Sequence, residues 1–214
     1  IGEIQNKGLA LDVDVLSDKG KSLKNVKGEL VCKNPFPSMP LKFWNDKNDI
    51  KFKNAYFNKF KNIWHHGDYA EIKKNGGYII HGRSDTTLNP GGVRLGTSEI
   101  YSEVEKFPQI KESIVVGQSW DNDVRIILFI VMNQKFKFTE ELLKKIKIQI
   151  RENTSPRHVP RKVIVVKDIP RTKSGKIVEL AVKNVIEGNN IKNKEALANP
   201  KSLEQFKNLK ELSY

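Results

Sequence analysis

The sequence predicts an α+β protein of two units, a β-rich stretch over residues 1–84 followed by a mixed α/β stretch over residues 85–214. Two observations predict this division. The first third has short alternating or apolar runs separated by turn sequences, the pattern of antiparallel strands. From Asp85, a loop rich in Thr, Asn, Pro and Gly is followed by apolar strands interleaved with amphipathic helices, which places the boundary at Asp85.

The first unit shows four element signals. Apolar residues alternate with mostly polar or small residues over 9–15, which predicts a strand. The turn sequence SDKGKS follows, and GELVC at 28–32 predicts a second strand. Apolar spacing over 49–60 predicts a helix. The stretch at 68–82, DYAEIKKNGGYIIHG, predicts a hairpin because a Lys-Asn-Gly-Gly turn joins two short apolar runs.

The second unit alternates helices and strands. Ile100, Val104 and Phe107 predict one face of a helix, and apolar runs at 113–118 and 124–132 predict two strands. Thr139 is expected to cap a helix that carries Leu142, Leu143, Ile146 and Ile150.

Three more elements complete the second unit. The sequence predicts a strand at 162–166 and a helix from about Ile177 to Gly188. Near the end of the chain, Ser202 and Gln205 have capping-box spacing, which predicts a short helix containing Leu203, Phe206 and Leu209.

Composition excludes some classes of protein. With 38% hydrophobic residues in 214, the chain can bury a core. The longest apolar run, Ile126–Met132, is far short of the roughly 18–20 residues of a membrane helix. Cys32 is the single cysteine, so no internal disulfide forms and a cytoplasmic location is favoured. The chain begins without an initiator methionine or signal sequence, and we expect a piece of a longer protein.

A net charge of +13 raises the alternative of a non-catalytic module that binds nucleic acid or another polyanion. However, most of the charge comes from 31 scattered lysines, which are typical of a solvated surface. Aromatic residues are not interleaved with the basic ones over 151–176, as stacking on single strands would need. Four of the seven arginines fall within this range and suit bidentate phosphate recognition.

The stretch DIPRTKSGKIVE, from Asp168 to Glu179, invites comparison with a phosphate-binding P-loop. That motif needs a glycine five residues before the Gly-Lys pair and a Ser or Thr after it. Here Pro170 and Ile177 occupy those positions, so the P-loop interpretation fails. The stretch instead offers Lys176, preceded by a flexible Ser-Gly, just before a predicted helix.

Four motifs in this order resemble the C-terminal end of the adenylate-forming superfamily of acyl-CoA synthetases. They are WHHGDYAE, HGRSDTTLNPGGVRLGTSEIYSEVE, RENTSPRHVPR and IPRTKSGKI. Two further stretches, NPFPSMPLKFW and EALANPKSLEQF, resemble its acetoacetate–CoA ligase branch. The resemblance implies a small C-terminal lid domain, a mixed sheet with flanking helices, preceded by a β-rich remnant of a large N-terminal domain. It also implies that a carboxylate is joined to AMP and then passed to coenzyme A.

The resemblance assigns roles in ATP and AMP binding to three residues. Asp68 would accept hydrogen bonds from both ribose hydroxyls, which suits a carboxylate with two acceptor oxygens. Arg83 would also contact the ribose, and Arg94 would face the nucleotide phosphate. Asp85 would be the hinge at which the lid rotates, because a short polar side chain tolerates unusual backbone angles.

The resemblance also assigns residues to coenzyme A. Gly91 and Gly92 would line the pantetheine tunnel, where a missing Cβ lets backbone approach a narrow ligand. Arg151 would meet the nucleotide phosphate of coenzyme A, with Arg157 and Arg161 available to assist.

Lys176 matches the adenylation lysine, whose ammonium group would neutralise charge between the carboxylate and the α-phosphate. The implied substrates and cofactors are acetoacetate, ATP, Mg²⁺ and coenzyme A, with no nucleic acid or membrane partner. The ATP phosphate loop, the magnesium-placing residues and the acyl pocket belong to the missing N-terminal domain, so no metal ligand is assigned here and the piece is expected to be inactive alone. Acetate and propionate remain alternative substrates.

Overall fold

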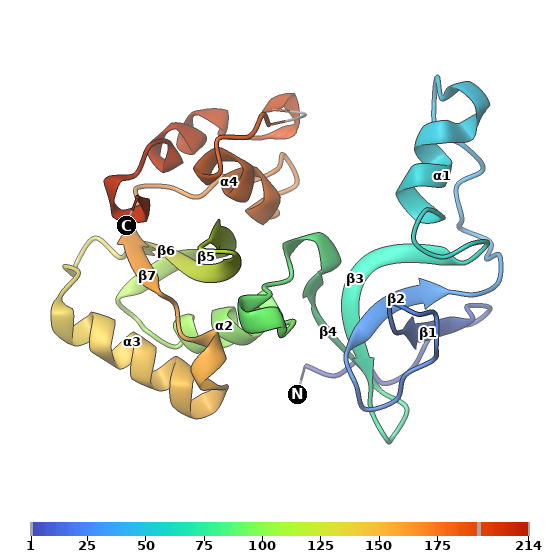
Figure 1. Ribbon diagram of the computed structural model, residues 1–214, viewed down its shortest axis with the longest axis horizontal. Helices are drawn as coiled ribbons and strands as arrows, with labels where there is room; N and C mark the ends of the chain where they lie inside the picture. The colour runs from blue at the N-terminus through green and yellow to red at the C-terminus, as the bar shows by residue number, and fades with distance from the viewer. Residues whose placement is uncertain (1, 192–193, 214) are drawn as a thin grey trace. The chain divides into compact units, whose positions relative to one another are not determined.

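The computed structural model describes residues 2–191 and 194–213. The chain divides into two compact units, Ile1–Asp85 and Thr86–Tyr214. Each has a sheet and a core of its own (Figure 1). This division falls immediately after Asp85, the residue at which the sequence places its boundary.

The first unit is a four-stranded antiparallel sheet in the order β1 (Val13–Leu16), β2 (Gly28–Cys32), β3 (Trp64–Ile72) and β4 (Tyr78–Arg83). The second strand and the hairpin are confirmed. The prediction that β1 begins near Leu9 is wrong. Ala10 has a left-handed φ of 63°, the Leu11 amide bonds the Gly8 carbonyl in a turn, and Leu9 is 99% exposed, so the apolar alternation runs on into a turn.

Helix α1 (Ile50–Tyr56) is shorter than the predicted helix over 49–60. Asp46 sets its start, since one carboxylate oxygen accepts from the Lys51 amide at 2.9 Å and the other from the Phe52 amide at 2.7 Å. The helix packs an aromatic cluster against β3, in which Tyr56 stacks on Trp64 with ring centroids 3.7 Å apart.

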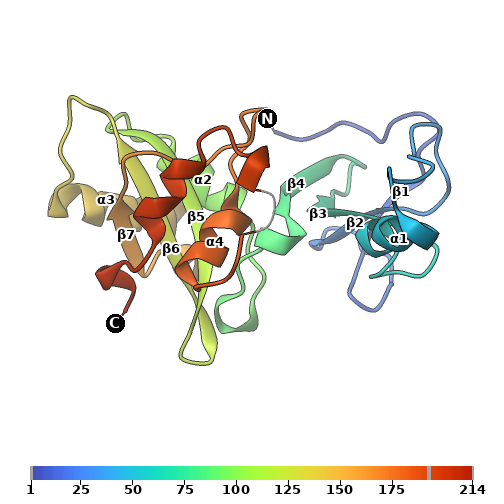
Figure 2. The same ribbon diagram turned by 90° about the horizontal axis from the view of Figure 1, so that it is seen from above.

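The second unit is built on a three-stranded mixed sheet. β5 (Ile110–Trp120) pairs antiparallel with β6 (Asp123–Met132), and β7 (Lys162–Val165) pairs parallel with β6. One face packs on α2 (Thr97–Val104) and α3 (Glu140–Asn153), and the other on α4 (Glu179–Ile186) and the C-terminal segment (Figures 1 and 2). Both faces of β6 are therefore buried, which explains its unbroken apolar run.

The predicted cap of α3 is confirmed, because the Thr139 hydroxyl accepts from the Leu142 amide at 3.2 Å. Helix α2 ends at Val104, so Phe107 lies beyond it and packs against the core from the following turn. The remaining helical elements are short 3₁₀ turns: η1 (Lys47–Asp49), η2 (Ser84–Thr86), η3 (Pro90–Gly92), η4 (Pro156–His158), η5 (Lys194–Ala196), η6 (Pro200–Phe206) and η7 (Lys210–Leu212).

The capping box predicted at Ser202 is wrong. Element η6 begins two residues earlier, at Pro200, whose fixed φ and missing N–H suit a first helical position. Ser202 therefore lies inside the turn and donates to the Asn199 carbonyl, while Gln205 bonds backbone carbonyls rather than a cap amide. Among the described residues, no helix has both the length and the apolar character needed to cross a membrane.

Candidate functional site

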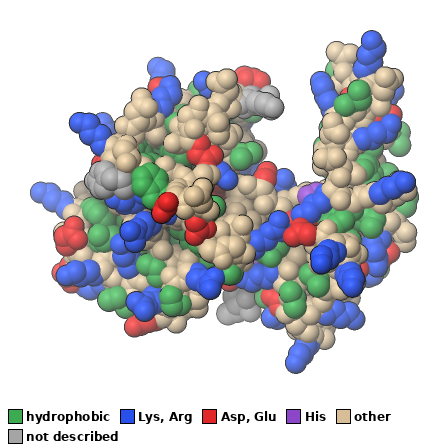
Figure 3. Space-filling view, in the orientation of Figure 1, with side chains coloured by type: hydrophobic (Ala, Val, Ile, Leu, Met, Phe, Trp, Pro, Cys, Tyr) green, Lys and Arg blue, Asp and Glu red, His purple; other side chains and the backbone are tan. Residues whose placement is uncertain are grey.

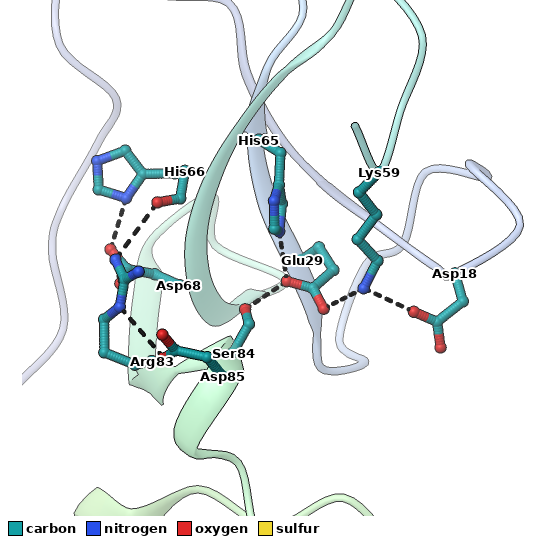
Figure 4. A network of polar contacts seen from close by, with 9 residues as sticks. All are labelled: Asp18, Glu29, Lys59, His65, His66, Asp68, Arg83, Ser84 and Asp85. Atoms are coloured by element: carbon teal, nitrogen blue, oxygen red, sulfur yellow. Dashed lines mark hydrogen bonds and ion pairs between the residues drawn. The ribbon is translucent and has the colours of Figure 1, made fainter. Parts of the chain in front are cut away.

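A group of polar residues lies beside the start of β3 and the end of β4, in the first unit, and we call it the Asp68 cluster: His66, Asp68, Arg83 and Asp85. The strand register pairs Asp68 with Arg83, and their Oδ1 and Nη1 atoms are 3.3 Å apart. His66 Nδ1 lies 2.6 Å from Asp68 Oδ2, and Arg83 Nε lies 3.6 Å from Asp85 Oδ1 (Figure 4). The structure thus brings together three of the residues that the sequence singles out.

The charges of this cluster keep Asp68 ionised. Partial burial alone would raise the pKa of the Asp68 carboxyl. The hydrogen bond with His66 and the charges of His66 and Arg83 outweigh that effect and hold the pKa below its usual value. In turn, the hydrogen bond with Asp68 raises the pKa of His66. An ionised carboxylate has acceptor capacity beyond these two partners, as diol binding requires.

Gly67 is required by the geometry of the cluster. Its φ is 84°, and a Cβ on this residue would lie 2.8 Å from Arg83 Nη2. Both the backbone angle and the close approach of the guanidinium favour glycine. The backbone here borders a hollow of about 550 Å³ that is also lined by Tyr56, Trp64 and Arg83, so the cluster opens onto space that a ligand can enter.

A second network, centred on the buried Glu29, lies on the opposite face of β3, and we call it the Glu29 network: Asp18, Glu29, Lys59, His65 and Ser84. Consecutive residues of a strand point to opposite faces. His66 accordingly meets Asp68 on one side while His65 Nε2 meets Glu29 Oε2 at 3.0 Å on the other (Figure 4). Lys59 bonds Glu29 at 2.5 Å, and the Ser84 hydroxyl also donates to it.

Glu29 is 1% exposed, so burial alone would raise the pKa of its carboxyl. The hydrogen bonds from Lys59, Ser84 and His65, with the charge of Lys59, outweigh burial and lower the pKa to about 2. Sequence reasoning missed this network. The local sequence offers one indication of it: Glu29 is an acidic residue within the otherwise uncharged strand GELVC. A charged residue in such a strand is often buried and paired.

The loop with Gly91 and Gly92 is closed by two backbone bonds between Leu88 and Leu95. Both glycines have left-handed φ values, 58° and 75°. The Gly91 amide donates to both carboxylate oxygens of Asp123, at 2.8 and 3.0 Å. No described atom lies within 4 Å of a Cβ placed on Gly92, so this unit requires glycine there for its backbone angle rather than for lack of space.

The arginines assigned to phosphate groups lie on the surface of the second unit. Arg94 follows the glycine loop and is exposed. Arg151, in the last turn of α3, is also exposed and borders a hollow of about 340 Å³ lined by Lys147, Pro156 and Val159. Arg157 approaches the glycine loop, since a Cβ on Gly91 would lie 3.6 Å from its Nη1.

Lys176 ends a tight turn. The Gly175 amide bonds the Thr172 carbonyl, the Lys176 amide bonds Thr172 Oγ1, and the Thr172 amide bonds the Lys176 carbonyl. Gly175 supplies the left-handed φ of 84° that the turn needs. These amides are engaged within the turn, so they cannot wrap a phosphate as P-loop amides do. The side chain of Lys176 is exposed and available to a ligand.

Tyr101 was not singled out by the sequence, yet it ties three elements of the second unit together. Its buried hydroxyl donates to Glu179 Oε1 at 3.0 Å, at the start of α4, and accepts from the Val115 amide of β5 at 3.1 Å. Burial and the nearby Glu179 charge raise the pKa of Tyr101 well above its usual value, so the hydroxyl remains a donor.

Replacing Tyr101 by phenylalanine is expected to destabilise the second unit by about 1–3 kcal/mol, because it leaves the buried Val115 amide without this acceptor. Urea unfolding followed by circular dichroism measures the loss. Tyr56→Phe is the matched control, since the contact that holds Tyr56 is ring stacking on Trp64, and we expect a change below about 0.5 kcal/mol. Equal stability of Tyr101→Phe and the unmodified protein would contradict the role of this hydroxyl.

The distribution of charged and metal-ligating side chains was compared with the features above, for the face drawn in Figure 3 and for the described residues. In the face that Figure 3 shows, Lys and Arg side chains are spread over each unit rather than gathered in one patch. Within residues 2–191 and 194–213, no group of three or more His, Cys, Asp and Glu is arranged to hold a metal ion. The Asp68 cluster and the Lys176 turn are therefore the features with the clearest chemistry.

The sequence and the fold of this chain were each compared with those of known proteins, and both are similar to enzymes of the same class. Residues 99–176 match the model of the AMP-binding enzyme C-terminal domain. A benzoate CoA ligase from Burkholderia xenovorans shares the fold, with a TM-score of 0.68 over 82% of this chain and 34% of that one, at 24% identity. The domain match and the fold thus make this chain similar to one class of protein, the AMP-binding enzymes, in their C-terminal region.

Within that class, the chain is similar over its whole length to acetoacetyl-CoA synthetases. It is 56% identical to the one from Rhizobium meliloti over 99% of this chain and 32% of that protein, and 49% identical to the one from Xenopus tropicalis over the same shares. The acetoacetyl-CoA synthetase structure from Streptomyces lividans matches with a TM-score of 0.91 at 39% identity, covering 96% of this chain and 31% of that one. The chain spans about a third of the length of these relatives.

Proposed function

We propose that this chain is the C-terminal part of an acetoacetate–CoA ligase, which activates acetoacetate with ATP as an acyl-adenylate and transfers the acyl group to coenzyme A. The observation that carries the proposal is the 56% identity to the Rhizobium meliloti acetoacetyl-CoA synthetase along 99% of this chain. ATP, Mg²⁺ and coenzyme A are the implied substrates and cofactor. The Mg²⁺ site, the acyl pocket and a cytoplasmic location are parts of the same proposal.

The first unit contributes nucleotide binding. Asp68 accepts hydrogen bonds from the two ribose hydroxyls, and the lowered pKa of its carboxyl supplies the ionised acceptor at neutral pH. Arg83, held against Asp68 and Asp85, presents donors to the same sugar. Asp85 is the hinge, and its place at the boundary between the two compact units supports that role.

The second unit contributes groups for both half-reactions. Lys176 neutralises the charge that develops as the carboxylate attacks the α-phosphate, and its exposed ammonium on a long stem supports that role. Arg94 meets the nucleotide phosphate. For thioester formation, Gly91 and Gly92 border the pantetheine path and Arg151 meets the nucleotide phosphate of coenzyme A.

Asp68→Asn in the complete enzyme is expected to raise the KM for ATP by ~10- to 100-fold, the equivalent of losing hydrogen bonds to a charged acceptor. The KM for acetoacetate should change little. Steady-state kinetics with ATP varied at saturating acetoacetate measures this. Asp121→Asn is the control, since Asp121 lies in the β5–β6 turn with a left-handed φ of 50° that asparagine also adopts. An unchanged KM for ATP would contradict the ribose assignment.

Substrate choice is tested by measuring thioester formation by the complete enzyme with acetoacetate, acetate and propionate side by side. We expect the highest kcat/KM with acetoacetate. A preference for acetate or propionate would instead make the protein another short-chain acyl-CoA synthetase. No thioester with any of the three, combined with salt-dependent binding of DNA or RNA, would favour the polyanion-binding module.

A further inference from the structure

The segment Ala196–Asn199, which we call the tail strand, lies beside the arm that leads into the Lys176 turn. The Lys173 amide bonds the Ala196 carbonyl at 3.1 Å, and the Ala198 amide bonds the Arg171 carbonyl at 2.8 Å. Thr172 and Leu197 form the bridge between them. The tail strand lies beyond residue 176, the last residue that matches the C-terminal-domain model, and belongs to the same compact unit as the lysine turn.

The side chain of Asn199 reinforces this pairing with three hydrogen bonds. Its Oδ1 accepts from the Arg171 amide at 2.8 Å. Its Nδ2 donates to Asp168 Oδ2 at 2.7 Å and to the Ile169 carbonyl at 2.9 Å. One amide side chain thus bonds three residues, Asp168, Ile169 and Arg171, immediately before the turn.

The tail strand is itself held firmly to the second unit. Leu197, Leu203 and Phe206 are buried, and the ring of Phe206 packs edge-to-face on Phe129 of β6 at 4.9 Å. Gln205 binds the same loop as Asn199, because it accepts from the Lys167 amide and donates to the Asp168 carbonyl, both at 2.7 Å. The core therefore anchors the segment that holds the loop.

A second anchor acts on the other side of the turn. The guanidinium of Arg171 donates to the Gly175 carbonyl at 2.8 Å and lies 3.2 Å from Glu112 Oε2 on β5. The turn has only two short arms of its own, and such small hairpins are marginally stable without further packing. Its geometry thus depends on Arg171, whose backbone amide and carbonyl are both bound by the tail strand.

We propose that the tail strand positions Lys176 for adenylation, with Asn199 as the positioning residue. Asn199 acts through the loop at 168–171 and touches neither the lysine side chain nor the substrate. The proposal rests on the proposed function of Lys176 in the first half-reaction. It adds that the C-terminal segment helps to hold the catalytic turn in place, since displacing a catalytic group by about 1 Å can lower the rate by roughly 100-fold.

The first test is Asn199→Ala in the complete enzyme, with the two half-reactions measured separately. Acid-dependent ATP–pyrophosphate exchange, with whichever of the three short-chain acids the unmodified enzyme accepts, should fall by ~10- to 100-fold. Thioester formation from supplied acyl-adenylate should stay within about twofold, because Lys176 serves the first step alone. Glu204→Ala is the matched control in the following element η6, since it removes an exposed pair with Lys207 that contributes little.

The second test exchanges the side chains of Asn199 and Asp168, so that loss of this contact can be distinguished from misfolding. Asn199→Asp places a carboxylate against Asp168 and should lose exchange activity. Combining it with Asp168→Asn restores one donor and one acceptor across the 2.7 Å contact and should recover most of that activity. A global folding defect would not be reversed by a second substitution that restores only this contact.

Hydrogen–deuterium exchange of the complete enzyme supplies a readout that needs no activity. Asn199→Ala should speed exchange over residues 171–176, where the Lys173 and Lys176 amides are bonded, and leave β5 and β6 unchanged. Equal losses of rate in both half-reactions would overturn the positioning role. So would faster hydrogen–deuterium exchange over residues 171–176 with an undiminished rate of adenylation. Failure of the unmodified enzyme to use acetoacetate would refute only the proposed substrate.

Discussion

Replacing Lys176 by alanine in the complete enzyme is expected to abolish adenylate formation while leaving thioester formation from supplied acetoacetyl-adenylate largely intact. Removing one preorganised charge from a transition state typically raises the barrier by about 3–4 kcal/mol, or ~10²- to 10³-fold in rate. Acetoacetate-dependent ATP–pyrophosphate exchange reports the first step, and release of the thioester from added adenylate and coenzyme A reports the second.

The matched control is Lys173→Ala, three residues earlier on the same exposed turn. Its backbone amide carries the contact with the tail strand, and alanine keeps that amide. Lys176→Arg should also fail in the first step, since a planar guanidinium does not replace a compact ammonium. Equal loss of both half-reactions in Lys176→Ala would refute the assignment of this lysine to adenylation.

Replacing Glu29 by glutamine is expected to destabilise the first unit by about 3 kcal/mol, the free energy that corresponds to lowering the pKa of its carboxyl from 4.5 to about 2. The substitution keeps the shape of the side chain and removes the charge that Lys59 and His65 face. Urea unfolding followed by tryptophan fluorescence measures it, because two of the three tryptophans, Trp44 and Trp64, lie in this unit.

The pH dependence provides an independent check. Because the pKa of Glu29 is lower in the folded than in the unfolded protein, its contribution is complete above about pH 4.5 and is lost as the pH falls toward 2. Glu29→Gln should lack this part of the acid dependence. Asp18→Asn, which removes only the exposed partner of Lys59, should change stability by less than about 1 kcal/mol. A Glu29→Gln protein as stable as the unmodified one at pH 7 would contradict the prediction.

Local signals in the sequence predicted most of the fold. The antiparallel pair β5–β6 and the Thr139 cap follow from patterns within a few residues. The errors at Leu9 and Ser202 arose where a local pattern competed with a stronger backbone preference, the left-handed turn at Ala10 and the proline at position 200. In both places the pattern is present in the sequence, but a neighbouring residue decides the structure: Ala10 forms a turn, and Pro200 begins the 3₁₀ element.

The candidate site divides in the same way. Asp68, Arg83 and Lys176 were found because they lie in motifs that resemble a known family. His66, Tyr101 and Asn199 were missed, since what defines each is a partner brought near by strand register or core packing. Tyr101 and its partner Glu179 are 78 residues apart in the chain, and a single sequence carries no signal for such a pair.

The Glu29 network has a mechanical consequence at the end of the first unit. Ser84 is hydrogen-bonded to a buried carboxylate that stays charged down to about pH 2, whereas the contact that Asp85 makes among the described residues is an exposed ion pair with Arg83 at 3.6 Å. Ser84 is therefore the last fixed point of this unit. If Asp85 is the hinge, as proposed, we expect the torsional movement of the chain to begin one residue later, with a pivot that keeps its place throughout the physiological pH range.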